Sequence, residues 1–367
     1  MKILYDHQIF SIQKYGGISK YFCELMKNLP SGSQYKLSLL FSDNQHLKDD
    51  QKKFKKINTF LPDKEFRGKS FLKKKLYNIN KVYSKYIIES NKYDLLHPTF
   101  YDTYFLNNLK KPYVITVHDL IDFKFKDLYR HNSRRLQIEE IIKNANRIIS
   151  ISENTKNDII DILQINPEKI DVIHHGFNPP ATKNTSNAFG RYILFVGSRW
   201  GYKNFTIFAR AVSTVLNKEK NLKLICVGAP FNKREIDELC NLKMFEKTIV
   251  LGVNENKLNT LYSNALVFVY PTLYEGFGMP ILEAFANNCP VCLSNTSSLP
   301  EIAGDAGVYF DPNDEESISD SIRKVIYDHD YSKKIIKAGG NRLKNFSWKK
   351  CAEQTLHSYQ NVLPYSS

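Results

Sequence analysis

The sequence predicts an α/β protein of two domains, each built on a parallel sheet covered by helices. Its 367 residues, 42% of them hydrophobic, are more than one core of ordinary size requires. Short apolar runs alternate with helical patterns in both halves, and this alternation is typical of parallel strands joined by helices. A polar, proline-marked stretch at residues 178–190 separates the halves as a linker does.

Each half supplies its own set of elements. In the first half we expect helices at 18–29, 133–144 and 154–163, and strands at 2–5, 36–40, 93–96, 113–117, 147–151 and 169–173. In the second half we expect helices beginning near Asn204, Lys233, Glu255, Pro280 and Asp314, and strands at 192–196, 223–227, 248–251, 266–269 and 291–294. The domains are therefore expected at 1–177 and 191–346, followed by a segment at 347–367.

Two glutamates follow the apolar run at residues 265–270. Glu275 lies in a glycine-rich loop, and Glu283 falls eight positions later, in the first turn of a helix that we expect to start at Pro280. The order is strand, loop and helix N-terminus. In open α/β sheets ligands bind at the carboxyl ends of strands, where helix N-termini favour anionic and hydroxyl-rich groups. The pair predicts a ligand site.

A basic stretch runs from Lys48 to Lys85, where thirteen Lys or Arg stand against four acids in a chain of net charge +14. Within it, apolar residues recur at helical spacing among lysines, at Leu72, Leu76, Ile79, Tyr83 and Tyr86. Such a basic amphipathic helix can lie on an anionic membrane. The alternative is a helix packed on the core with a solvated lysine face.

Other classes of site find little support. Cys289 and Cys292 form a C-x-x-C without a second pair, so we expect neither a zinc nor a redox site, and the scattered histidines have no metal-ligand spacing. No aromatic platform or finger pattern accompanies the basic charge, so we expect no nucleic-acid partner. No apolar run reaches the length of a membrane span, and residues 2–5 fit a first strand.

The motifs resemble a known family in an ordered series. They are Tyr15-Gly16-Gly17-Ile18, Val117-His118-Asp119, Ser150-Ile151-Ser152-Glu153, His174-His175-Gly176, Val196-Gly197-Ser198-Arg199 with Lys203, and the Glu275 to Glu283 pair. The chain resembles the retaining, nucleotide-sugar-dependent glycosyltransferases of family 4, over nearly its whole length. The resemblance implies the GT-B fold, two Rossmann-like domains with parallel sheets facing an interdomain cleft. The first would bind the acceptor and the second the donor, and the final helix at 347–367 would cross back onto the first domain.

The resemblance also implies roles in donor binding. Arg199 and Lys203 would hold the diphosphate, as a forked donor and a point charge in one loop can. Glu283 would bind the ribose, and Glu275 the sugar, together with the backbone amides of Phe277, Gly278 and Met279. The structural alternatives are solvated loop cations, a carboxylate stabilising a helix start, and a plain glycine turn.

Two further motifs belong to the first domain. The amides of Gly16 and Gly17 would face an anion between a strand and a helix, or they form a simple turn. His118 would lie against the donor sugar, where its ring can hydrogen-bond a hydroxyl or its carbonyl can stabilise positive charge. The alternative for His118 is a polar residue satisfied at a strand end. We assign catalysis to Glu275, His118, Arg199 and Lys203.

We therefore expect a hexosyltransferase with GDP-mannose as the slightly favoured donor. UDP-glucose, UDP-galactose and UDP-N-acetylglucosamine remain alternatives. The acceptor would be a lipid-linked glycan in surface polysaccharide or lipopolysaccharide assembly, and the enzyme would be cytoplasmic or peripheral at the inner face of the membrane. The cationic side chains make a metal unnecessary, and we expect no cofactor. Other possibilities are a phosphorylase, an epimerase, or a non-catalytic glycan or membrane adaptor of the same fold.

Overall fold

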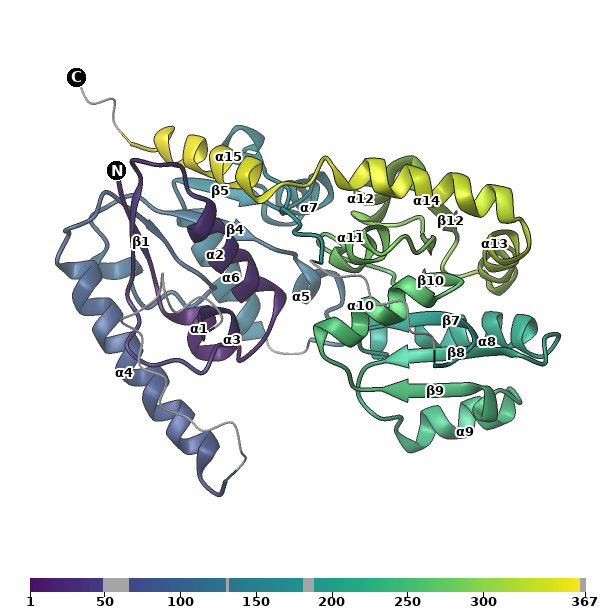
Figure 1. Ribbon diagram of the computed structural model, residues 1–367. Helices are drawn as coiled ribbons and strands as arrows, with labels where there is room; N and C mark the ends of the chain where they lie inside the picture. The colour runs from purple at the N-terminus through teal and green to yellow at the C-terminus, as the bar shows by residue number, and fades with distance from the viewer. Residues whose placement is uncertain (49–65, 130–131, 181–187, 364–367) are drawn as a thin grey trace. The chain divides into compact units, whose positions relative to one another are not determined.

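The computed structural model describes residues 1–48, 66–129, 132–180 and 188–363. The chain divides into two compact units (Figure 1). Unit 1 consists of Met1–Gly176 and Ser347–Ser367, and unit 2 of Phe177–Phe346. Part of the predicted basic stretch, residues 49–65, and most of the predicted linker lie outside the described residues.

Unit 1 is built on parallel strands. They are β1 (Lys2–Tyr5), β2 (Gln34–Leu37), β3 (Leu95–His97), β4 (Val114–Val117), β5 (Arg147–Ser150) and β6 (Ile170–Val172). The strands pair in the orders β2-β1-β3 and β4-β5-β6, and a parallel bridge between Leu96 and Tyr113 joins the two groups. The strand β1 therefore lies between β2 and β3, and the strand order changes direction at β1.

Helices cover both faces of this sheet. They are α1 (Gln8–Ile12), α2 (Gly17–Asn28), α3 (Gln45–Lys48), α4 (Lys69–Glu89), α5 (Ile121–Lys124), α6 (Asn132–Asn144), α7 (Glu153–Leu163) and α15 (Trp348–Gln360), with short 3-10 turns at Leu106–Asn108 and Pro167–Lys169. One core cluster joins α2 and α15 to one face of β1, and another joins α4, α6 and α7 to the opposite face. The apolar alternation along β1, with Ile3 in the first cluster and Leu4 in the second, explains this division.

The last helix, α15, belongs to unit 1 and lies along α2 (Figure 1). Trp348 at its start is 4% exposed, and its ring stacks on His175 with 6.0 Å between centroids. Gly176 permits this contact, because a Cβ there would lie 2.1 Å from the Trp348 backbone nitrogen. The close approach gives His175 and Gly176 a structural part in joining the ends of unit 1.

The structure buries only part of the predicted apolar face of α4, of which three members are half-buried and two are exposed. Ile79 and Tyr86, which we assigned to the apolar face, are 46% and 70% exposed, whereas the polar Asn80 and Ser84 are 1% and 0% exposed. The reason is hydrogen bonding. The Asn80 amide oxygen accepts from the backbone nitrogen of Phe41 at 3.0 Å, and its amide nitrogen donates to the carbonyl of the same residue at 2.8 Å. A buried amide that satisfies the backbone in this way outweighs the apolar spacing.

Unit 2 contains a parallel sheet of six strands in the order β12-β11-β10-β7-β8-β9. They are β7 (Arg191–Val196), β8 (Leu222–Val227), β9 (Thr248–Leu251), β10 (Val267–Tyr270), β11 (Val291–Ser294) and β12 (Gly307–Phe310). The helices are α8 (Phe205–Leu216), α9 (Lys233–Asn241), α10 (Glu255–Asn264), α11 (Met279–Ala286), α12 (Leu299–Ala303), α13 (Glu315–Tyr327) and α14 (His329–Leu343), with 3-10 turns at Gly201–Lys203, Phe245–Lys247 and Gly304–Ala306. The four inner strands β7, β8, β10 and β11 are buried on both faces, as their continuous apolar runs require, whereas the edge strands β9 and β12 are partly exposed.

These observations confirm the predicted α/β class with two Rossmann-like domains. The periodicity argument did not identify β12, α12 or α14 as elements of unit 2. It placed β2 two residues too late, because the apolar run at 36–40 continues past the paired residues Gln34–Leu37. No helix among the described residues is both long and apolar enough to cross a membrane.

Candidate active site

The point where the strand order of unit 2 changes direction lies between β7 and β10, which are neighbours in the sheet although two strands separate them in the chain. Ligands in open α/β sheets bind outside the carboxyl ends of strands at such a point. The loop after β7 carries Arg199 and Lys203, and the loop after β10 carries Glu275. Topology therefore brings together residues 72 positions apart.

Lys203 and Glu275 form an ion pair at this point. The Lys203 Nζ lies 2.5 Å from Glu275 Oε1, and the two side chains are 16% and 15% exposed. Tyr270, at the end of β10, also hydrogen-bonds Glu275. Burial, and secondly the charge of Glu275, raises the pKa of Tyr270 well above its ordinary value, so its hydroxyl keeps its proton and donates. The carboxylate of Glu275 is thus held from two sides.

Arg199 takes a different partner from the one expected. Its Nε donates to Glu235 Oε1 at 2.7 Å, and its Nη2 donates to the carbonyls of Ala229 at 2.7 Å and Pro230 at 3.0 Å. The guanidinium lies 4.5 Å from the ring centroid of Phe231. Among the described residues, the buried Nη1 has no hydrogen-bond partner. The structure thus fixes three sides of the guanidinium and leaves one buried nitrogen without a hydrogen-bond partner among the described residues.

Glu283 lies on α11, whose hydrogen-bonded start differs from the prediction. The helix begins at Met279, so Glu283 is its fifth residue. We had predicted Glu283 in the first turn, and it lies just beyond that turn. Its Oε2 accepts a hydrogen bond from the Tyr262 hydroxyl at 3.2 Å. Burial, and secondly Glu283, raises the pKa of Tyr262 well above the ordinary value, so Tyr262 remains a donor. No contact in the described structure joins Glu283 to Glu275.

The loop between the two glutamates is tightly packed. Gly278 has a φ of +109°, and a Cβ there would lie 3.0 Å from Ile281 Cδ1, so glycine is required on both counts. Phe277 is 4% exposed and packs edge-on against Phe346. Its ring is therefore part of the core, as the structural alternative held. The backbone amide of Met279 begins α11, where amides have no intrahelical partner.

In unit 1, Gly16 and Gly17 begin α2 as expected, but a side chain already occupies the turn. The Gln13 Oε1 accepts from the backbone nitrogen of Ser19 at 3.1 Å, which caps the helix. A Cβ on Gly16 would lie 2.4 Å from that oxygen, whereas one on Gly17 would meet nothing within 4 Å. An anion at this turn would take the place of the Gln13 oxygen.

His118 follows the end of β4 and is 7% exposed. Its ring meets that of Tyr21 edge-on with 5.2 Å between centroids, and its backbone nitrogen donates to the Tyr101 hydroxyl at 3.2 Å. Burial lowers the pKa of His118 to about 3, so the imidazole is neutral at physiological pH. Its Nε2 has no hydrogen-bond partner among the described residues. The alternative, a histidine whose polar atoms are satisfied at a strand end, does not account for this unpaired Nε2.

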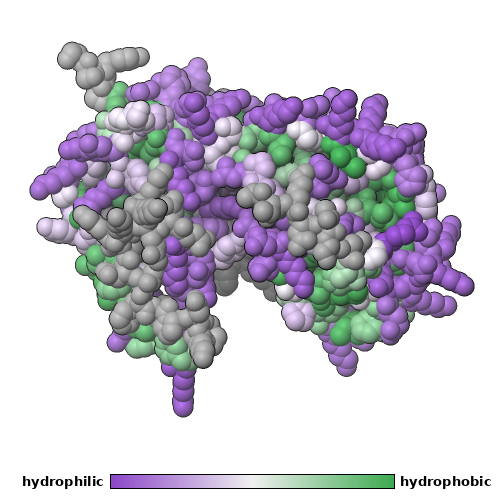
Figure 2. Space-filling view, in the orientation of Figure 1, coloured by the Kyte–Doolittle hydropathy of each residue, from purple (hydrophilic) through white to green (hydrophobic). Residues whose placement is uncertain are grey.

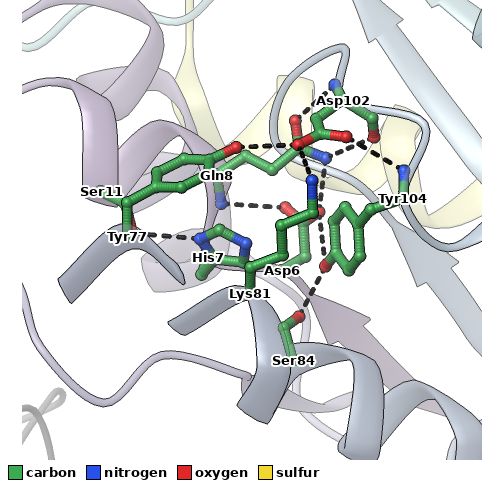
Figure 3. A network of polar contacts seen from close by, with 9 residues as sticks. All are labelled: Asp6, His7, Gln8, Ser11, Tyr77, Lys81, Ser84, Asp102 and Tyr104. Carbon is green, nitrogen blue, oxygen red and sulfur yellow. Dashed lines mark hydrogen bonds and ion pairs between the residues drawn. The ribbon is translucent and has the colours of Figure 1, made fainter. Parts of the chain in front are cut away.

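The corresponding switch point of unit 1, between β1 and β3, carries a polar network that the motifs did not reveal (Figure 3). The Asp6 carboxylate, 0% exposed, accepts from the backbone nitrogen of Thr99 at 2.8 Å and from Gln8 Nε2 at 2.7 Å. Asp102 pairs with Lys81 of α4 at 2.7 Å. The network fastens α4 to the carboxyl ends of the two strands.

Sequence reasoning missed several residues that position the candidate site. Glu235 forms a capping box with Asn232, and this fixes the carboxylate that holds Arg199. The Asn-x-x-Glu spacing was the available signal. Ser298 Oγ donates to the carbonyls of Glu275 and Phe277, both at 2.9 Å. No sequence signal links Ser298 to that loop, because the contact depends on the order of β10 and β11. Within the described ranges, no three His, Cys, Asp or Glu side chains gather as a metal site would require.

Two family models match the chain. The model described as Glycosyltransferase Family 4 covers residues 15–180, and the model described as Glycosyl transferases group 1 covers residues 181–342. O-antigen chain mannosyltransferase B of Escherichia coli is 30% identical over 270 residues, which cover 67% of this chain and 70% of that protein. O-antigen chain mannosyltransferase RfbU of Salmonella typhimurium is 30% identical over 216 residues, which cover 58% and 60% of the two chains.

Solved structures agree on the fold. The Anabaena protein HepE in complex with UDP and glucose superimposes with a TM-score of 0.75 at 17% identity, covering 98% of this chain and 99% of that one. Together with the two parallel sheets, this similarity identifies the fold as GT-B. The matched models and the mannosyltransferase relatives show that this chain belongs to the glycosyltransferases of family 4.

Proposed function

We propose that this glycosyltransferase moves a hexose from a nucleotide diphosphate sugar to a lipid-linked glycan during surface polysaccharide or lipopolysaccharide assembly. The observation that carries the proposal is the Lys203–Glu275 pair at the switch point of unit 2, with the buried, unpaired Nη1 of Arg199 in the loop that also carries Lys203. GDP-mannose is the favoured donor, because the two relatives at 30% identity are named O-antigen mannosyltransferases.

In this proposal the donor exchanges partners with the ion pair. Its diphosphate takes the Lys203 ammonium and the free Arg199 nitrogen, because both cations stabilise phosphate charge. Glu275 then turns to the hexose, held by the Tyr270 hydroxyl. Glu283 accepts hydrogen bonds from the ribose hydroxyls, and the amides at residues 277–279 line the hexose.

The reaction proceeds with retention and without a metal. The bond between the anomeric carbon and the phosphate oxygen breaks, and a bond from the acceptor oxygen to the same carbon forms on the same face. The acceptor proton passes to the leaving phosphate oxygen. Neutral His118 accepts or donates one hydrogen bond to the sugar through its unpaired Nε2, and it adds no charge that would oppose a cationic transition state.

A UDP-hexose is the second candidate donor. HepE, whose fold this chain shares, is described in complexes with UDP-glucose and with UDP and glucose. In either case the base would be recognised largely through backbone contacts, which a sequence does not reveal.

The acceptor substrate gives a reason for membrane contact. The basic segment from Lys48 to Lys85 would hold the enzyme at the anionic inner face of the membrane, with each lysine near the surface contributing about 1 kcal/mol. Residues 49–65 of that segment lie outside the described residues. Flotation with phosphatidylglycerol vesicles tests this step, and reversing the charge of Lys73, Lys74 and Lys75 should reduce the bound fraction.

The test of the function is a donor screen with two readouts. The enzyme is incubated with each nucleotide sugar, with and without a membrane extract as the acceptor source, and both free nucleotide diphosphate and labelled lipid-linked glycan are measured. We expect GDP release to rise in step with mannosylated product. Release without product would indicate hydrolysis, and the absence of both with every donor would overturn the proposal.

A further inference from the structure

We propose that unit 1 contains a second ligand site, a pocket for a phosphate ester at the amino ends of strands β1 and β2. A cavity of about 330 Å³ lies between the starts of β1 and β2 and the end of α4. Its volume is within the range of small-molecule sites. Gly16 and Asp6 follow the carboxyl end of β1, whereas this cavity is lined by Lys2 and Gln34 at the first residues of their strands. The inference does not depend on the proposed function.

Three ammonium groups line the cavity. Lys2 pairs in register with Gln34 and Leu4 with Lys36, so Lys2 and Lys36 lie on the same face of the sheet. Lys92 joins them from the loop after α4. Within the described ranges, none of these three lysine side chains has an ion-pair partner. The neighbouring carboxylate, Asp94, accepts a hydrogen bond from the backbone nitrogen of Lys2 at 2.7 Å. The three lysines outnumber this one carboxylate, so the surroundings of the cavity carry net positive charge, which suits an anion.

A buried hydroxyl completes the anion site. Tyr93 lines the cavity and is 5% exposed, yet its hydroxyl has no hydrogen-bond partner in the described part of the chain. Leaving such a group unpaired costs free energy. Burial raises the pKa of Tyr93 to about 12, so the hydroxyl keeps its proton and can donate to a phosphate oxygen. A bound phosphate would satisfy this donor and the lysines together.

The same cavity opens onto apolar surface. Tyr86 lines it and is 70% exposed. An outward-facing stripe continues from Tyr86 along α4 through Val82, Ile79 and Phe71, which are 71%, 46% and 64% exposed. Lysines flank the stripe in the sequence. Figure 2 shows hydrophilic and hydrophobic residues side by side at lower left, where α4 lies in Figure 1. A phosphate ester on an apolar carrier, such as a phospholipid headgroup, matches both parts. A soluble phosphate ester shares the phosphate chemistry alone.

Two binding measurements on the full chain separate these sources. Calorimetric titration with glycerol 3-phosphate, in saturating GDP to occupy the proposed donor site, reports on the phosphate pocket. Flotation with phosphatidylcholine vesicles, with or without phosphatidylglycerol, reports on the lipid form. The variants are Lys36→Glu, Lys92→Glu and Tyr93→Phe. Lys334→Glu, an exposed lysine of unit 2, is the control with the same change in net charge.

We expect each pocket charge reversal to weaken glycerol 3-phosphate binding at least about 10-fold, and Tyr93→Phe about 2- to 10-fold. Lys334→Glu should bind as wild type does. Loss of vesicle flotation in the same variants identifies a lipid headgroup, whereas unchanged flotation with lost titration identifies a soluble ester. Absence of binding by wild type, or equal binding by wild type and all pocket variants, overturns the site. Unchanged circular dichroism and thermal unfolding of the variants show that unit 1 is folded, and GDP binding, which the proposal assigns to unit 2, separates this outcome from failure of the proposed transferase.

Discussion

Removing one member of the Lys203–Glu275 pair should destabilise unit 2 strongly. With both side chains about 15% exposed, Glu275→Gln leaves an ammonium largely buried beside a neutral amide. Breaking a fully buried pair costs about 3–5 kcal/mol, and the remaining exposure places the cost near the lower end, at about 3 kcal/mol. For a unit of this size that corresponds to a fall in Tm of about 6–12 °C.

Scanning calorimetry of the full chain measures this effect through a double-mutant cycle. Lys203→Met should cost a similar amount, and the double variant should lose about 2 kcal/mol less than the sum of the single variants. Arg210→Met is the control, because its pair with Glu238 is 3.6 Å long and the arginine is 52% exposed, so we expect a loss below about 1 kcal/mol. Additive losses in the cycle would refute the coupling of the pair.

Three further changes test the packing of unit 1. Burial lowers the pKa of His118 to about 3, below the unfolded value of 6.5, so its contribution to stability is complete above about pH 6.5 and is lost as the pH falls toward 3. His118→Phe should therefore reduce the fall in the free energy of unfolding in urea over this pH range, by up to about 1.4 kcal/mol per pH unit. An unchanged slope would argue against a buried neutral imidazole. Gly176→Ala should force α15 away and raise hydrogen exchange along that helix, whereas Gly340→Ala, whose Cβ meets nothing within 4 Å, should not. Asn80→Ala should lower stability in urea by about 2–4 kcal/mol because it leaves buried backbone groups unpaired, and a loss as small as that of exposed Asn78→Ala would contradict the anchoring of α4.

The sequence predicted the elements whose pattern reflects burial alone. The strand at Val267–Tyr270 is apolar at every position and buried on both faces, so its run of residues identified it directly. For α4 the same method was wrong only in part, because Ile79 and Tyr86 are exposed while Asn80 and Ser84 are buried by hydrogen bonds to distant segments. Such contacts depend on which strands become neighbours, and periodicity within one helix carries no information about that.

The candidate site divides in the same way. Lys203 and Glu275 lie in loops that follow parallel strands, so a rule about strand ends was enough to place them at one edge of the sheet. Whether they touch depends on β7 and β10 being adjacent, which only the structure gives. Arg199 illustrates the limit, because its partner Glu235 belongs to a capping box that follows the next strand, β8. The orphaned Tyr93 hydroxyl had no signal in the sequence.

The central claim assigns different parts of the donor to the two glutamates, and calorimetric titration of GDP tests it most directly. Glu283→Ala should weaken GDP binding at least about 10-fold, because the ribose loses a charged acceptor. Glu275→Ala should bind GDP within about threefold of wild type while mannosyl transfer falls by about 10²–10³-fold. Weakened GDP binding in Glu275→Ala together with unchanged binding in Glu283→Ala would contradict the account.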